Sequence, residues 1–478
     1  MLSNHQRNIY HGLLGGCGIL LVCCAGSSSN SRRIQAIDCM TGSGNLATVA
    51  FRATVVSAIR QPVTTTKLGL AVLWNRPREI IVGNSPGNMT PQPPLVEIPG
   101  TPAFEKLLDG KRFPVAESGS IRWLVDGHRF FPELERQIAA ACRSIDCQVF
   151  IFDNDDIGVR FADLMKRRSA EVRVHVLFDD LGSYGSYSAA PETLGPRGFV
   201  PPSDMHAYLR DHSDVRARRT LNPWLVADHT KLFVFDQSTA ILGGMNIGRE
   251  YHSEWHDLMI RVEGPVVRTL SGEFNRAWRK AGPMGDLALL RKPAFLRRPR
   301  PVTDGITLRV LRTDPAEGCY EIVDSILLAI GGARKRVWIE NPYFSNDEVA
   351  KAVQAAALRG VDVRVIIPAA GDSPVMDAGN LSTASGIILA GGQVFRYPEM
   401  THLKAMICDD WAIVGSANLD TLSMRINREL NIAFSHHRSV KELEKAVFLP
   451  DLRRSGKIRI SETADIANGV AEAIADQL

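Results

Sequence analysis

The feature that most constrains this sequence is the pattern H-x-K-x4-D, which occurs twice. The first copy consists of His229, Lys231 and Asp236, and the second of His402, Lys404 and Asp409. The chain has twelve histidines, and with Lys and Asp each near one residue in twenty, chance predicts only about 0.03 such matches. Two copies therefore indicate a duplicated unit.

The hydrophobic pattern before each motif repeats as well. Before the first motif it predicts strands at 121–125, 149–152 and 172–178 and helices at 131–144 and 157–168. Before the second it predicts strands at 308–311, 337–340 and 363–367 and helices at 322–330 and 347–358. Residues 147–151 align with 335–339, and residues 171–174 with 362–365. We therefore expect an α/β fold made of two copies of about 170 residues, each a parallel or mixed sheet covered by helices.

Two proline-rich segments predict the boundaries of these copies. Five prolines between Ser85 and Thr101 exclude a continuous helix and indicate an extended linker. A second, basic linker at 291–305 is expected to be solvated or to contact anionic lipid headgroups. The expected organisation is an N-terminal arm at 27–115, a first half at 116–290, this linker, and a second half at 306–478.

The N-terminus has the pattern of a targeting segment. An uncharged stretch from Gly12 to Gly26 is shorter than the roughly 20 apolar residues that cross a bilayer as a helix. It is typical of a secretory signal, and Cys24 with the serines after it resembles a bacterial lipoprotein signal. We expect residues 1–26 to be an export or lipoprotein-like segment, with an uncleaved anchor or an ordinary apolar N-terminus as the alternative.

Composition argues against several other classes of protein. Lys plus Arg (56) exceed Asp plus Glu (52) by only four, which does not predict a dedicated nucleic-acid surface. The eight cysteines include no C-x-x-C pair, so they indicate neither a structural zinc site nor a disulfide framework.

The repeated residues fit chemistry on a phosphate. The segments 232–235 and 405–408 read as strands, so residues two positions apart share a face, and each motif histidine lies beside its lysine. A neutral imidazole can attack phosphorus while an ammonium neutralises a non-bridging oxygen. Asn246 and Asn418, in glycine-containing turns after the motifs, can donate a further hydrogen bond to the same phosphate.

The acidic residues divide into two groups. Asp236 and Asp409 lie an odd number of positions from their histidines, so strand alternation turns them away and predicts a structural role. A carboxylate on the second ring nitrogen fixes the tautomer of a reacting histidine. Asp257 and Glu429 follow the two motif histidines by 28 and 27 residues, and these matched offsets make them the candidates.

The two motifs, with Gly-Gly-Met-Asn at 243–246 and Gly-Ser-Ala-Asn at 415–418, resemble the phospholipase D superfamily. The sequences at 255–265 and 415–431 are similar to bacterial cardiolipin synthases. The resemblance covers about Ser120 to the C-terminus. It implies two α-β-α sandwich halves packed around one shared active site that needs no metal or other cofactor.

The resemblance also implies roles for the site residues. One histidine forms a phosphohistidine, and the other protonates the leaving alcohol and then deprotonates the incoming one. Carried over, His229 is the nucleophile and His402 the general acid and base, although the sequence alone does not fix that order. The phosphate would be held by Lys231, Lys404, Asn246 and Asn418.

The implied function is that of a phosphatidyltransferase like a cardiolipin synthase, with phosphatidylglycerol as the expected substrate and a membrane surface of the bacterial cell envelope as its location. A hydrolytic phospholipase D is the close alternative, because it differs only in admitting water. A nucleic-acid phosphodiesterase is a further alternative, for which Arg216, Arg218 and Arg219 beside Trp224 could bind a polyanion; export and the weak net charge argue against it. A noncatalytic scaffold is expected to have lost a motif residue, and none is missing.

Overall fold

The computed structural model describes residues 49–463 apart from residue 50 and the segments 83–93, 185–194 and 291–301. The expected signal segment and most of the basic linker therefore lie outside the described residues. In the described part of the chain, no helix is both long and apolar enough to cross a membrane.

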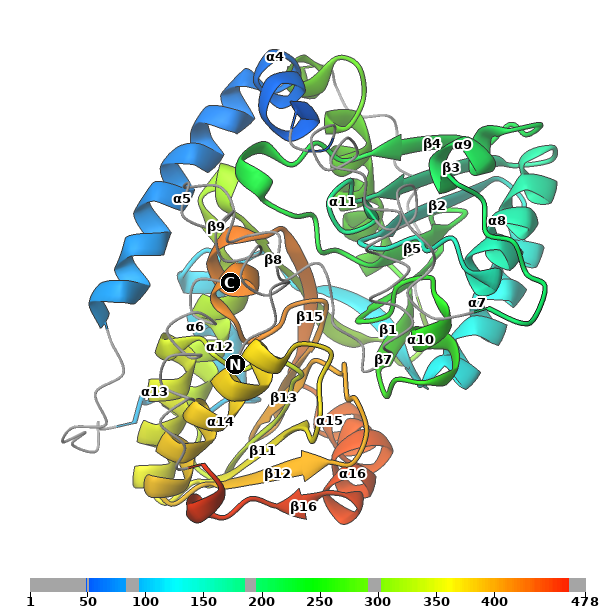
Figure 1. Cartoon of the computed structure of the whole chain (residues 1–478). Coiled ribbons are helices and arrows are strands. Elements are labelled where there is room, and N and C mark those ends of the chain that lie inside the picture. Colours follow the sequence, from blue (N-terminus) through cyan, green and yellow to red (C-terminus); the bar gives the residue numbers. More distant parts are fainter. Residues whose placement is uncertain (1–48, 50, 83–93, 185–194, 291–301, 464–478) are drawn as a thin grey trace, which may run out of the picture.

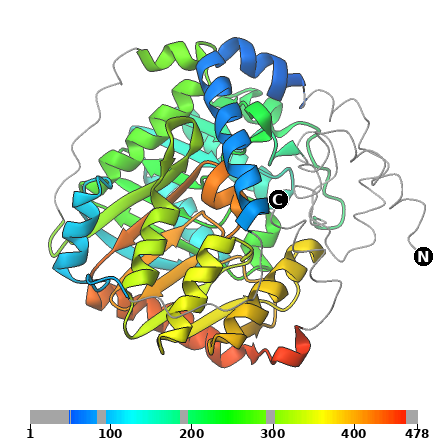
Figure 2. The same ribbon diagram turned by 90° about the vertical axis from the view of Figure 1, so that its left-hand side faces the viewer.

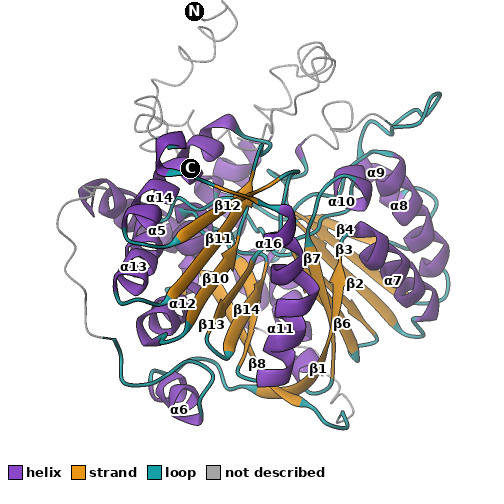
Figure 3. Ribbon diagram, turned by 90° about the horizontal axis from the view of Figure 1, so that it is seen from below, coloured by secondary structure: helices purple, strands orange, loops and turns teal. Residues whose placement is uncertain are grey.

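Each half contributes the same strand order to one continuous sheet (Figures 1 and 3). The first half contributes, from the centre outward, β1 (Glu117–Val125), β7 (Leu258–Glu263), β6 (Thr239–Gly243), β5 (Leu232–Phe235), β2 (Ser144–Val149), β3 (Arg173–Phe178) and β4 (Arg216–Arg219). The second contributes β8 (Ile306–Asp314), β15 (Glu429–Phe434), β14 (Trp411–Gly415), β13 (Ala405–Cys408), β10 (Arg336–Glu340), β11 (Asp362–Pro368), β12 (Gln393–Tyr397) and β16 (Gly456–Lys457), with the short β9 (Cys319–Tyr320) beside β8. The halves join where β1 pairs antiparallel with β8. This mirrored order confirms the predicted duplication.

Helices cover the sheet on both faces (Figure 3). The first half carries α7 (Gly127–Ala140), α8 (Asp156–Ser169), α9 (Met205–Arg210), α10 (Arg249–Ser253) and α11 (Val266–Lys280). The second carries α12 (Glu321–Gly332), α13 (Asp347–Leu358), α14 (Pro374–Leu389), α15 (His437–Leu443) and α16 (Leu449–Arg454). Before them come α4 (Ser57–Arg60), α5 (Pro62–Val82) and α6 (Pro102–Gly110).

The apolar interior ties the halves into one unit. One core lies under α7 and α8 in the first half, and another lies under α12 and α13 in the second. A third core is shared, because Leu270 and Phe274 of α11 belong to the same buried cluster as Val440 and Leu443 of α15. The relative position of the two halves is thus set by side-chain packing as well as by the β1–β8 pairing.

The predicted helix at 131–144 and strand at 149–152 are displaced in the structure. The helix ends at Ala140 and β2 begins at Ser144. The cause is Asp236, whose carboxylate accepts the backbone N–H groups of Cys142, Arg143 and Ser144 and fixes the turn there.

The same geometry corrects the alignment of the two copies. Asp409 accepts the N–H groups of Arg334, Lys335 and Arg336, so Ser144 is equivalent to Arg336. Residues 143–147 therefore match 335–339, four positions from the alignment that the apolar pattern suggested.

Candidate active site

The two motif histidines lie just before equivalent strands, at the junction of the halves. His229 precedes β5, and its N–H donates to the carbonyl of Arg428 at 2.9 Å. His402 precedes β13, and its N–H donates to the carbonyl of His256 at 2.7 Å. Each histidine segment thus pairs with a segment of the other half, and the acceptor residue is the one that precedes a candidate acid.

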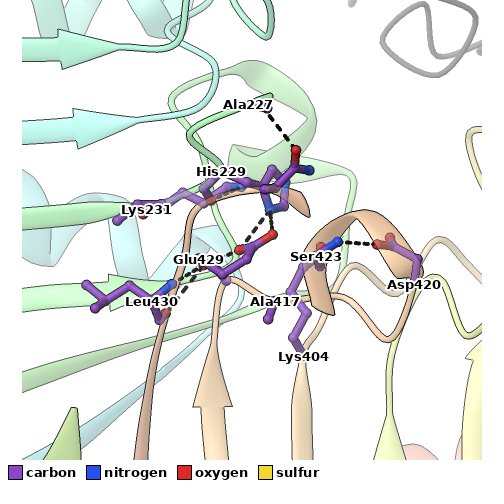
Figure 4. Close-up of polar contacts among 12 residues, drawn as sticks. Ala227, His229, Lys231, Lys404, Ala417, Asp420, Ser423, Glu429 and Leu430 are labelled. Atoms are coloured by element: carbon purple, nitrogen blue, oxygen red, sulfur yellow. Dashed lines mark hydrogen bonds and ion pairs between the residues drawn. The ribbon is translucent and has the colours of Figure 1, made fainter. Parts of the chain in front are cut away.

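The two candidate acids are exchanged between the halves. Nδ1 of His229 lies 2.9 Å from Oε1 of Glu429, which comes from the second half (Figure 4). Nδ1 of His402 lies 2.7 Å from Oδ2 of Asp257, which comes from the first half. All four side chains are buried. Because each Nδ1 is engaged by a carboxylate, Nε2 of each ring is the nitrogen left for chemistry.

The motif lysines lie behind the histidines. Nζ of Lys231 donates to the backbone carbonyl of His229 at 2.8 Å, and Nζ of Lys404 donates to that of His402. Only 1% of Lys231 and 2% of Lys404 is exposed. Their charges are therefore held close to both imidazoles, where little solvent screens them.

Burial keeps the histidines neutral at neutral pH. It lowers the pKa of His229, a shift that Glu429 opposes and Lys231 reinforces. It also lowers the pKa of His402 well below its usual value, with the charge of Lys404 adding to the effect. A neutral ring keeps its lone pair free for attack on phosphorus.

The neighbouring charged groups are shifted by the same burial. The pKa of Lys231 is lowered well below its usual value, and that of Lys404 is lowered to about 8. Burial raises the pKa of Asp257 to about 7, although the charge of Lys404 favours the ionised carboxylate and opposes this rise.

The two histidines and the two asparagines line one cavity of about 140 Å³. Oδ1 of Asn246 accepts the N–H of Ile151 at 3.0 Å, and its Nδ2 donates to the Tyr251 hydroxyl at 2.9 Å. Oδ1 of Asn418 is buried and accepts no hydrogen bond from the residues that the structure describes. Four of the predicted site residues therefore face the same space, while the lysines support it from behind.

Aromatic rings surround His402 in this cavity. The ring centroids of Tyr251, Trp255 and Tyr343 lie 5.5, 5.3 and 6.5 Å from that of His402. Phe150 packs edge-on against His229 at 4.8 Å. These rings limit water around the two imidazoles and provide an apolar wall beside the polar groups.

The turns behind the two acids differ. A Cβ on Gly244 would lie 2.2 Å from Oδ1 of Asp257, so this position has no room for a side chain. In the second half, the hydroxyl of Ser416 donates to Oε2 of Glu429. The carboxylate of Asp257 is therefore confined by the backbone at Gly244, and that of Glu429 is held by the hydroxyl of Ser416.

The motif aspartates lie away from the cavity. Asp236 and Asp409 each accept three backbone N–H groups at the start of β2 and β10. Neither contacts a motif histidine in the structure.

Sequence reasoning missed His256, the neighbour of Asp257. Its Nδ1 lies 2.7 Å from Asp126, and its Nε2 lies 3.1 Å from Asp451 and 3.8 Å from Glu340. Burial opposes a charge on this ring, but the hydrogen bonds to Asp126 and Asp451 raise the pKa of His256 to about 11. Its only sequence signal is its place between Trp255 and Asp257, because its partners come from distant segments.

This cluster also bears on metal binding. Within the described residues, His256, Glu340 and Asp451 form one of two groups whose ligand atoms lie within 4.8 Å of one another. The other consists of Asp153, Asp155 and Glu250. In the first group the protonated imidazole already supplies the positive charge that the carboxylates need.

Two repeated halves that share one sheet and place two histidines with exchanged carboxylates at one cavity define a member of the phospholipase D superfamily. The family model described as "Cardiolipin synthase, PLD-like domain" matches residues 134–278 and 326–447. The chain therefore belongs to the family of cardiolipin synthase, phospholipase D-like proteins.

Individual relatives agree. The chain is 33% identical over 336 residues to cardiolipin synthase A of Pseudomonas fluorescens Pf-5, a match that covers 67% of this chain and 66% of the relative, slightly under two thirds of its length. It is 32% identical over 378 residues to cardiolipin synthase A of Pseudomonas aeruginosa PAO1, which covers 75% of this chain and 74% of the relative. The crystal structure of phosphatidylserine synthase from Haemophilus influenzae Rd KW20 has a similar fold, with a TM-score of 0.61 and 13% identity over 79% of this chain and all of the other.

Proposed function

We propose that this protein is a phosphatidyltransferase that acts on phospholipid phosphodiesters through a phosphohistidine. The observation that carries the proposal is the pair of buried, neutral imidazoles at one cavity, each bonded at Nδ1 to a carboxylate from the opposite half. The names of its relatives support a reaction like that of cardiolipin synthase.

The first half-reaction forms the phosphohistidine. Nε2 of His229 attacks phosphorus, a P–N bond forms, and the P–O bond to the first alcohol breaks. In the lipid complex the negative phosphate favours the protonated form of His402, and this imidazolium gives the proton of Nε2 to the leaving oxygen and becomes neutral. Glu429 stabilises the positive charge that the ring of His229 acquires when it is bonded to phosphorus.

The second half-reaction reverses these roles. His402 takes the proton of the incoming alcohol, whose oxygen attacks phosphorus while the P–N bond breaks. Asp257 keeps the proton at Nδ1 of His402, so that Nε2 is the atom that gives and takes protons. Lys231 and Lys404 neutralise the phosphate charge, and Nδ2 of Asn246 and Asn418 can donate to its oxygens.

The substrate that we propose is phosphatidylglycerol. Transfer of a phosphatidyl group from one molecule to a hydroxyl of a second gives cardiolipin and releases glycerol. With water as the acceptor, the same intermediate gives phosphatidic acid, which is the hydrolytic alternative. We also propose that the enzyme works on a membrane surface of the bacterial cell envelope, because its substrate is a bilayer lipid.

The nucleic-acid alternative receives little support from the arginine cluster. Arg218 donates to the carbonyl of Trp278 and stacks over its ring at 4.1 Å. Arg219 pairs with Asp204 at 2.9 Å. Two of the three arginines are therefore engaged within the protein.

The proposal is tested by incubating the protein with labelled phosphatidylglycerol and separating the products. Labelled cardiolipin is the expected product, and added glycerol should suppress it by reversing the transfer. H229A and H402A should each abolish turnover with the fold retained. Phosphatidic acid as the sole product would instead establish the hydrolase, and full activity in either variant would exclude the shared two-histidine site.

A further inference from the structure

We infer that the outer face of α5, together with Trp224, is a docking surface for an anionic lipid bilayer. The inference rests on the proposed function in one respect, namely that the substrate is a phospholipid. It goes further by assigning the contact to a particular face of the molecule, which Figure 2 turns toward the viewer.

The exposed side chains of α5 form an apolar stripe. Val63, Leu70, Leu73 and Trp74 are between 57% and 75% exposed. Val63, Leu70 and Trp74 follow the spacing i, i+7, i+11, which places them on one side of a helix. An apolar stripe of this size on an outer helix marks an interaction site more often than a random surface.

The opposite side of α5 is fixed to the protein. Leu68 is buried in a cluster with Val226 and Ile426, and Nδ2 of Asn75 donates to the Tyr320 hydroxyl at 2.9 Å. Thr64 bonds to Asp286 through both its N–H and its hydroxyl. The helix therefore cannot turn its apolar stripe inward.

The inner side of α5, opposite the stripe, lies next to the cavity of the candidate active site. Leu422 packs against the cluster around Leu68 and also lines the cavity. Leu225, in the short turn 223–225, lines the cavity as well. The helix that carries the apolar stripe is therefore connected to the cavity wall through one apolar cluster.

Trp224 packs against α5 and precedes Leu225, which belongs to the cavity wall. Its ring lies against Gly69, and its Nε1 donates to the carbonyl of Thr65 at 2.7 Å, while 55% of the residue is exposed. Trp224 and Leu225 both have positive φ, 60° and 59°. Such backbone is costly for non-glycine residues, and here it holds an indole outward and a leucine inward. An indole with a bonded N–H and an exposed ring suits the polar-apolar boundary of a bilayer.

The charge of this segment selects an anionic lipid surface rather than a second copy of the chain. Residues 51–75 contain Arg52, Arg60 and Lys67 and no acidic residue. Arg60 and Lys67 are exposed, and Lys67 lies within the apolar stripe. Two copies of this face would bring like charges together, whereas acidic headgroups attract them.

The test is co-sedimentation with vesicles of equal parts phosphatidylglycerol and phosphatidylcholine. L70S/W74S should weaken binding at least about tenfold. A tenfold change corresponds to about 1.4 kcal/mol, and even part of the transfer free energy of two large apolar side chains exceeds that value. V115S/L389S is the matched control, since Val115 and Leu389 are 82% and 66% exposed and lie elsewhere; it should bind like the parent protein. Bromine-labelled acyl chains should quench tryptophan fluorescence less in W74F.

Binding is measured without turnover, so failure of the transfer assay and failure of this inference are distinguishable. Equal binding of L70S/W74S and the control, with transfer intact, would overturn the docking surface alone. A lipid-free dimer that L70S/W74S dissociates would assign the face to a second copy and would also overturn it. Quenching that is unchanged in W74F would place Trp74 outside the bilayer.

Discussion

Replacing Glu429 by Gln should reduce kcat by about three orders of magnitude. The carboxylate lies 2.9 Å from Nδ1 of His229, and 2% of Glu429 is exposed. With charge centres about 4 Å apart and an effective dielectric constant near 20, its attraction for a positively charged ring is about 4 kcal/mol. Because each factor of ten in rate corresponds to about 1.4 kcal/mol, losing this charge costs about 10³. Gln keeps the shape and the acceptor atom, so the loss isolates the charge.

The assay is turnover of labelled phosphatidylglycerol in vesicles, with kcat and KM determined separately. E399Q is the matched control, because Glu399 is an exposed carboxylate that pairs with Arg454 at 3.0 Å. It should keep the parent kcat. The fall in E429Q should appear in kcat with a normal melting temperature, and less phosphohistidine should be trapped by rapid denaturation at alkaline pH, where its P–N bond is stable. A kcat of E429Q within tenfold of the parent value, or an equal loss in E399Q, would refute the reasoning.

Three further predictions address other parts of the site. G244A should lower kcat strongly, because a Cβ at position 244 would lie 2.2 Å from Oδ1 of Asp257. S416A should lower kcat only modestly, because Ser416 contributes one hydrogen bond to Glu429. Equal losses of kcat in the two variants would contradict this. The rate should fall above about pH 8, where Lys404 loses its proton, and below about pH 7, where Asp257 is protonated and loses the charge that holds His402; a pH–rate profile that is flat to pH 10 would exclude a charged Lys404. H256A should lower the free energy of unfolding by about 3–5 kcal/mol, since it leaves buried carboxylates without their cation. The pKa of His256 is raised from 6.5 to about 11, so its stabilising effect on the parent protein is complete below pH 6.5 and disappears as the pH rises through 11. Denaturant melts at several pH values should therefore show H256A less stable than the parent at neutral pH and equal to it above pH 11. A difference between the two proteins found only at alkaline pH would contradict this.

The sequence was most informative where apolar pattern and motif coincide. The strands after the two histidines run over Leu232–Phe235 and Ala405–Cys408, as predicted. Every residue in them is buried, so their apolar pattern identifies them. The strand before the first motif was misplaced for the opposite reason. β2 contains Asp146 and Gln148, which are buried although they are polar, so the apolar pattern predicts the strand at 149–152 instead.

The exchange of acids could not be read from the sequence. The offsets of 28 and 27 residues identify Asp257 and Glu429 as equivalent positions, but they say nothing about which histidine each one contacts. That depends on how the halves pack, through the β1–β8 pairing and the core shared by α11 and α15. The cluster around His256 was hidden in the same way, because it joins Asp126, Glu340 and Asp451 from segments far apart in the chain.

The central claim is that one histidine carries the phosphatidyl group while the other moves the proton. Its most direct test is rapid quenching of H402A with labelled phosphatidylglycerol, followed by peptide mass analysis. If His229 is the nucleophile, label should accumulate on the peptide containing His229, because the first step is slowed less than the release that needs a base. No label should appear on H229A. Label on the His402 peptide of H229A, with none on His229 in H402A, would contradict the assignment.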